Sequence, residues 1–114
     1  MTPYKKGRWA EKRAIVILRL KGYKILAERF KTPVGEIDVI ASKRKQLVFV
    51  EVKNRPSLSE ALDSLSLLQR KRIVQAAKMY LAKHPRWITG EIRFDVIAFW
   101  PWRWQHLQNA WNEI

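Results

Sequence analysis

The sequence contains no cysteine among its 114 residues, which excludes disulfide bonds, thiolate catalysis and zinc sites with Cys ligands. It also lacks any apolar run close to the ~18 residues that a membrane-spanning helix needs. Its N-terminus is basic but has no uninterrupted apolar stretch followed by a small-residue cleavage site, so we expect no secretory signal. These absences together predict a cytoplasmic protein that is not inserted in a membrane.

Acidic residues are also scarce, because 10 Asp and Glu stand against 23 Lys and Arg, a net charge of +13. Such a surplus attracts polyanions, nucleic acid first and an anionic membrane surface second. The imbalance is greatest in two segments: residues 1–31 hold ten basic and two acidic residues, and residues 64–90 hold six basic and no acidic residue. Contact with phosphates explains this better than a solvated surface does, and it predicts binding that weakens steeply with salt. The expected nucleic-acid contacts are Arg8, Lys12, Arg55, Arg70, Lys71 and Lys78.

The length suits one domain over residues 1–114, with no internal repeat and no linker rich in Gly, Pro or Ser. Hydrophobic periodicity and turn residues predict a helix over 7–22, strands over 23–30, 36–41 and 47–53, a helix over 57–83 and a strand over 91–99. The tail over 102–111 is expected to form a further strand or a short helix. This order of helix, three strands, helix and strand predicts an α/β fold, a small mixed sheet flanked by helices.

Two of these elements have a predicted buried side. The helix over 57–83 begins with a capping box at Ser57-Leu58-Ser59-Glu60, and its buried stripe is expected to comprise Leu67, Ile73, Ala76, Ala77 and Tyr80. The strand over 91–99 alternates apolar Ile92, Phe94 and Val96 with polar Glu91, Arg93 and Asp95. Alternation of this kind is typical of a strand with one buried face and one polar face.

The two central strands carry a group of charged residues. Strand side chains alternate between faces, so Glu36 shares a face with Asp38, and Glu51 shares a face with Lys53. If Ser42 pairs with Leu47 across a four-residue loop, Asp38 faces Glu51 and Glu36 faces Lys53. Opposed side chains have Cβ atoms about 4.5–5.5 Å apart, where like charges are destabilising. The two carboxylates therefore need a positive partner, either Lys53 or a divalent cation.

These residue types suit phosphodiester hydrolysis. Carboxylate oxygens without a Cys or a neighbouring His favour Mg²⁺ or Mn²⁺. A cation held this way binds a phosphate oxygen and lowers the pKa of a bound water. An adjacent ammonium group can orient that water and offset the charge of the transition state.

Three segments carry a resemblance to a known family: residues 35–41 (GEIDVIA), residues 48–55 (VFVEVKNR) and residues 93–96 (RFDV). Together they resemble the YraN-type family of small bacterial proteins, which is similar to Holliday-junction resolvases and other restriction-endonuclease-like nucleases with the PD-(D/E)xK pattern. The resemblance spans nearly the whole chain, and its most specific part is the combination of Asp38 with Glu51-Val52-Lys53. It implies the helix and strand order given above.

The resemblance also implies roles for individual residues. Asp38 and Glu51 would bind metal, Lys53 would be the catalytic lysine, and Glu11 would match an additional acidic ligand of the resolvase-like branch. A polar or basic residue near Gln69 to Lys71 would face the site. The implied activity is Mg²⁺- or Mn²⁺-dependent cleavage of nucleic acid, with DNA favoured over RNA and branched or flapped DNA as the expected substrate.

Several alternatives remain open at this point. Glu36 fits an ion pair with Lys53 or a solvated position, and Glu11 fits a surface charge equally well. Asp95 is expected to be structural and paired with an Arg, and His84 and His106 are expected to be ordinary polar residues. The tryptophans of the tail favour packing in the core or in a dimer interface over stacking on bases.

The sequence therefore predicts a metal-dependent endonuclease. The main rival is a weakly active or inactive nucleic-acid-binding module on the same fold, and a basic scaffold that docks on an acidic protein or a membrane surface is a third interpretation. Symmetric cutting of two strands would favour a homodimer.

Overall fold

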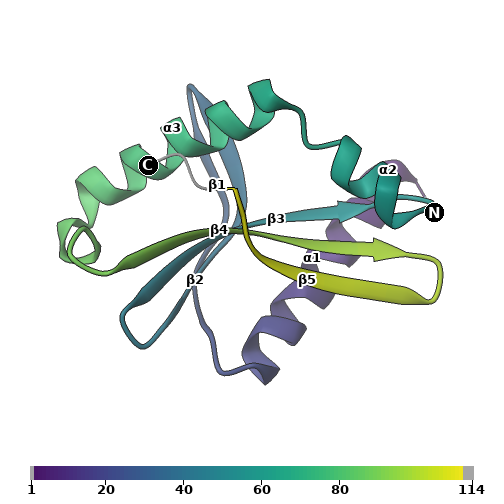
Figure 1. Ribbon diagram of the computed structural model, residues 1–114, viewed down its shortest axis with the longest axis horizontal. Coiled ribbons are helices and arrows are strands. Elements are labelled where there is room, and N and C mark those ends of the chain that lie inside the picture. The colour runs from purple at the N-terminus through teal and green to yellow at the C-terminus, as the bar shows by residue number, and fades with distance from the viewer. Residues whose placement is uncertain (1, 112–114) are drawn as a thin grey trace.

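The computed structural model describes residues 2–111 and forms a five-stranded sheet in the order β1-β2-β3-β4-β5 (Figure 1). The helices are α1 (Pro3–Leu20), α2 (Leu58–Asp63), α3 (Leu67–Lys83) and the short 3₁₀ helix η1 (Pro85–Trp87). The strands are β1 (Lys24–Thr32), β2 (Gly35–Lys43), β3 (Gln46–Asn54), β4 (Glu91–Trp100) and β5 (Arg103–Trp111).

The sheet is mixed, which confirms the predicted α/β class. β1, β2 and β3 are antiparallel neighbours, β3 and β4 are parallel, and β5 returns antiparallel to β4. The parallel step requires a crossover, and α2 and α3 provide it. Figure 1 shows α3 along one side of the sheet and α1 on the other, so the central strands are covered on both faces. The tail forms the strand β5, one of the two outcomes expected for it.

The first helix begins at Pro3, earlier than expected. Thr2 caps it by accepting a hydrogen bond from Lys5 N at 3.2 Å, and proline is well suited to a first helical turn. The helix ends at Leu20, just before Gly22, whose φ of +93° is left-handed. Within residues 2–111, no helix is both long and apolar enough to cross a membrane.

The second predicted helix is two helices, which corrects the single helix expected over 57–83. The capping box is formed, because Ser57 Oγ accepts from Glu60 N and donates to Glu60 Oε2. Ser66 then starts α3 by accepting from Gln69 N at 3.1 Å. The break changes the helix phase, so Leu65 is buried and Leu67, expected in the buried stripe, is 59% exposed.

Two apolar cores result from covering both faces of the sheet. One lies beneath α2 and α3 and includes Phe49 and Phe94, and the other lies beneath α1 and includes Leu18 and Val50. The expected polar face of β4 is therefore wrong for Arg93 and Asp95, which are both buried on the α1 side. They are tolerated there because they pair with each other, with Nη2 of Arg93 2.8 Å from Oδ2 of Asp95.

Candidate active site

The β2–β3 hairpin has the register expected from the sequence. Ser42 pairs with Leu47, and the same register continues as far as Val39 and Val50. The loop is shorter than expected, because Lys43 and Gln46 also pair. Beyond Val39 the paired register ends, and Asp38 Oδ2 accepts a hydrogen bond from Val52 N at 2.8 Å. The Asp38 carboxylate thus occupies the place of a backbone carbonyl where the two strands separate.

Glu51 and Lys53 are buried at the end of β3, with 5% and 7% of their surfaces exposed. Lys53 Nζ lies 3.7 Å from Glu51 Oε1. Gln69, from the first turn of α3, joins the two residues. Its Nε2 donates to Glu51 Oε1 at 3.2 Å and its Oε1 accepts from Lys53 Nζ at 3.2 Å. Within the described residues, the buried Glu51 Oε2 has no hydrogen-bond partner.

Helix α1 closes this region from the other side. Glu11 lines a cavity of about 290 Å³ together with Asp38, Glu51, Lys53 and Arg55. The remaining lining residues are Lys6, Gly7, Ala10, Val52 and Asn54. Three acidic side chains from three different elements therefore border one space, which is also lined by two lysines and one arginine.

The acidic groups of the cavity are buried close to one another, and their pKa values are raised. Burial raises the pKa of Glu51 well above its ordinary value, and the charge of Asp38 raises it further. Burial is also the main cause of the raised pKa of Asp38, although the bond from Val52 N and the charge of Lys53 oppose it. The pKa of Glu11 is raised by burial and by Asp38. Lys6, Lys53 and Arg55 also line the cavity, but within the described residues only Lys53 forms an ion pair with one of these carboxylates.

The donor set suits a hard divalent cation. All the acidic donors are carboxylate oxygens, and the buried Glu51 Oε2 lacks a partner. In the part of the chain that the structure describes, however, no three His, Cys, Asp or Glu side chains are grouped closely enough to hold an ion. Asp38 and Glu51, which are near neighbours, would supply the first ligands, with Glu11 at the margin of the same cavity.

Comparison with known proteins places the chain in a family. The model of "Uncharacterised protein family UPF0102" matches residues 10–99. The chain belongs to this family. It is 45% identical over 109 residues to a UPF0102 protein of Chelativorans sp., covering 95% of this chain and 88% of that protein. A UPF0102 protein of Nitrobacter winogradskyi is 47% identical over 107 residues, covering 93% and 91% of the two chains. The resemblance to the YraN-type family is thereby confirmed.

A solved structure supports the fold. The Holliday junction resolvase Hjc of Archaeoglobus fulgidus superimposes on this UPF0102 chain with a TM-score of 0.53 at 16% identity. The alignment covers 94% of this chain and 83% of the resolvase. At this identity the likeness concerns the fold, and it confirms the predicted restriction-endonuclease-like architecture.

One expected neighbour of the site lies elsewhere. Glu36 was expected opposite Lys53, but the strands have parted at that level and Glu36 pairs with Lys31 of β1 instead. Its carboxylate lies 3.7 Å from Arg29 Nε and its side chain is 45% exposed. Glu36 therefore influences the UPF0102 site only through its charge, which raises the pKa of Glu51 and Asp38.

The expected nucleic-acid contacts are distributed over three surfaces. Arg55 lines the cavity, and the charge of Arg8 lowers the pKa of Glu11 against the effect of burial. Lys12 lies on the adjacent side of α1, in a hollow lined also by Trp9 and Trp104. Arg70, Lys71 and Lys78 lie on α3, where Lys71 and Lys78 are exposed and Arg70 is half-buried.

The expectation for His106 needs correction, and the tail tryptophans differ in burial. His106 is not an ordinary polar residue, because its buried ring places Nε2 2.7 Å from Asp95 Oδ2 and Nδ1 2.8 Å from Lys21 Nζ. Asp95 is structural and paired with an Arg, as expected. Core packing applies to Trp111, which is buried, whereas Trp102 is fully exposed and Trp104 is 45% exposed.

Proposed function

We propose that this UPF0102 protein is a metal-dependent endonuclease that hydrolyses phosphodiester bonds in nucleic acid, with branched or flapped DNA as its substrate. The observation that carries the proposal is the shared cavity. Asp38, Glu51 and Lys53 come from two strands, Glu11 comes from α1, and all four line one space with an unpartnered buried oxygen. A cytoplasmic location, where nucleic acid is accessible, belongs to the same proposal.

The residues divide into three roles. Asp38 and Glu51, with Glu11, would hold Mg²⁺ or Mn²⁺. Such a cation, when bound, lowers the pKa of a water molecule and offsets charge on the phosphate. Lys53 orients the attacking water and stabilises the negative charge of the transition state. Gln69 is a positioning residue, because its amide bonds to Glu51 and Lys53 at once.

Binding of the substrate would rely on the basic surface. The net charge of +13 gives a long-range attraction to a polyanion. Arg55 borders the cavity itself, and Arg8 belongs to the same stretch of α1 as Glu11. Lys12, Arg70, Lys71 and Lys78 would contact phosphates farther along the strand. The fold likeness to a protein named as a Holliday junction resolvase supports DNA as the partner.

The test is cleavage of duplex, flapped and four-way DNA, and of RNA, in the presence of Mg²⁺ or Mn²⁺. Loss of a group that stabilises the transition state typically costs 10²- to 10³-fold in rate, so Lys53→Ala should lose about that much while it still binds the substrate. Lys31→Ala, which removes an exposed lysine of β1 outside the cavity, is the matched control. Cleavage by Lys53→Ala at the wild-type rate would overturn the proposal.

A binding module without catalysis is the second candidate. It is favoured by one observation, that the described residues contain no ready group of three metal ligands. This alternative predicts salt-sensitive binding to nucleic acid, no cleavage with either metal, and no thermal stabilisation by Mn²⁺. The same panel of substrates therefore separates the two candidates.

A further inference from the structure

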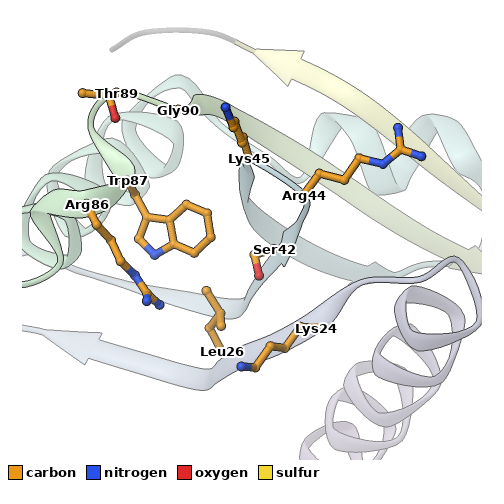
Figure 2. A pocket seen from close by; sticks show the side chains of 9 residues that line it. All are labelled: Lys24, Leu26, Ser42, Arg44, Lys45, Arg86, Trp87, Thr89 and Gly90. Carbon is orange, nitrogen blue, oxygen red and sulfur yellow. The ribbon is translucent and has the colours of Figure 1, made fainter.

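A second cavity, of about 430 Å³, lies at the other end of the β2–β3 hairpin from the candidate active site (Figure 2). Three segments form it: the start of β1, the hairpin turn, and the loop that contains η1. Its lining residues are Lys24, Leu26, Ser42, Arg44, Lys45, Arg86, Trp87, Thr89 and Gly90. Ser42 lies four residues beyond Asp38 on β2, a separation of about 13 Å along a strand.

The polar chemistry of this cavity favours an anion. Lys24, Arg44, Lys45 and Arg86 line it and no acidic residue does. Within residues 2–111, none of these four cations forms an ion pair. Every polar side chain in the lining can donate a hydrogen bond, and none is an obligate acceptor. Multiple donors with positive charge are the groups that bind phosphate.

Trp87 adds an unused donor. Its indole Nε1 is buried and has no hydrogen-bond partner among the described residues. The Arg86 guanidinium lies over its ring, 5.1 Å from the ring centroid. Figure 2 shows the indole in the middle of the cavity, between Arg86 and Ser42. A buried donor without a partner costs free energy, and an anion that accepts a hydrogen bond from the Trp87 indole would remove that cost.

The backbone segments that form the cavity are held together. Glu91 N donates to Lys45 O at 3.1 Å, which ties the loop to the hairpin turn. A Cβ on Gly90 would lie 2.5 Å from the same carbonyl oxygen, so only glycine allows this close approach. Arg44 has a φ of +57°, a conformation that favours Gly or Asn. The turn therefore carries an arginine at a position where glycine or asparagine would be less strained.

From these observations we infer that the cavity, which we call the Trp87 pocket, binds a nucleotide unit. Its phosphate contacts Arg86 and the Trp87 indole N–H, Lys45 adds positive charge across the cavity, and its base lies against the apolar surface of Trp87 and Leu26. The volume exceeds that of a phosphate alone and falls in the range of small-ligand sites. The unit is either a free nucleoside monophosphate or one nucleotide of a strand, since both present the same phosphate and base.

The experiment follows the indole N–H resonance of Trp87 by ¹H–¹⁵N NMR in the full chain, with the resonance identified by its loss in Trp87→Phe. The probes are inorganic phosphate, a nucleoside monophosphate and a short single-stranded oligonucleotide. We expect the resonance to shift on titration, with an apparent Kd at least 10-fold lower for the nucleotide than for phosphate. A shift with the monophosphate identifies the free nucleotide as a ligand, and a shift with the oligonucleotide alone identifies the strand.

The variant Lys45→Ala/Arg86→Ala should raise the Kd by at least 10-fold, whereas the charge-matched Arg19→Ala/Lys31→Ala should change it less than 2-fold. No shift with any probe, equal affinity for phosphate and nucleotide, or equal losses in the two double variants would each overturn the inference. Asp38→Asn should leave the Trp87 shift unchanged. The two proposals can therefore fail independently: the Trp87 pocket can bind no probe although the protein cleaves DNA, or it can bind a nucleotide although no cleavage is observed.

Discussion

Substitution of Asp38 separates two contributions that its carboxylate makes to the structure. The first is a hydrogen bond accepted from Val52 N at 2.8 Å, at the point where β2 and β3 part. Asp38→Ala leaves this part-buried N–H without a partner, which costs about 1–3 kcal/mol. For a domain of this size 1 kcal/mol corresponds to roughly 4–8 °C in Tm, so the Tm of Asp38→Ala should fall by roughly 4–24 °C.

The second contribution is negative charge, and its sign is opposite. The charge of Asp38 raises the pKa of Glu51, which means that it destabilises the ionised form of that neighbour. Asp38→Asn keeps an oxygen that can accept from Val52 N and removes the charge. We therefore expect Asp38→Asn to match or exceed the wild-type protein in free energy of unfolding at pH 7, although Asp38→Ala is less stable.

Thermal and urea unfolding of the three proteins, with and without Mn²⁺, measures both contributions. At a free metal concentration of 100 times its Kd, binding adds about 2.7 kcal/mol. The wild-type Tm should then rise by roughly 10–20 °C, and the rise should be absent in both variants. Glu36→Gln, which alters an exposed carboxylate paired with Arg29, is the control and should keep the rise. Equal stability of Asp38→Ala and Asp38→Asn would refute the capping argument, and an unchanged rise in both would refute the role of Asp38 as a ligand.

Three further predictions concern charge and hydrogen bonding. Because the raised pKa of Glu51 makes the native state bind more protons, Glu51→Gln should be more stable than wild type at pH 7, with the difference in urea unfolding vanishing below about pH 4. Gln69→Ala should lower the cleavage rate more than substrate binding, and Gln69→Glu should not restore it, since a carboxylate cannot donate to Glu51. Burial alone would raise the pKa of Asp95, but hydrogen bonds from His106 and Arg93 lower it. Asp95→Asn should thus cost about 3–5 kcal/mol in urea unfolding, and wild-type stability from this group should fall as pH drops below about 4.

The features that could be predicted from the sequence depend on short-range pairing. The register between Ser42 and Leu47 follows from a tight turn between two alternating strands. It ends at Val39 and Val50, one residue before the expected pair of Asp38 and Glu51, and Asp38 instead accepts a hydrogen bond from Val52 N. Because side chains alternate along β3, Glu51 and Lys53 lie on the opposite face of the strand from the valines that pack beneath α1. The position of Glu36 was wrong because the register was extended past the point where the strands separate, and no residue in the hairpin indicates that point.

Features that depend on distant segments were predicted only in part: the family resemblance implied that a residue near Gln69 to Lys71 faces the site, but nothing in the sequence indicated its contacts. Gln69 reaches Glu51 and Lys53 because Ser66 starts a new helix and sets the phase of α3. Ser64 and Ser66 are compatible with a helix interior or with a break, so the sequence alone did not distinguish them. The Trp87 pocket likewise combines three segments that only the folded sheet brings together.

The buried charges on β3 and β4 show why polarity along a strand does not by itself identify a site. Both strands are covered on two faces, and each buries an acidic and a basic residue two positions apart. The oxygens of Asp95 are fully used, because Oδ1 accepts from Arg93 and Asn109 N and Oδ2 contacts Arg93 and His106. Glu51 has one oxygen without a partner and borders a cavity. Since a buried acidic group normally satisfies its hydrogen-bonding capacity, the difference indicates that the Asp95 network serves the fold, and it supports the proposal that Glu51 binds a ligand.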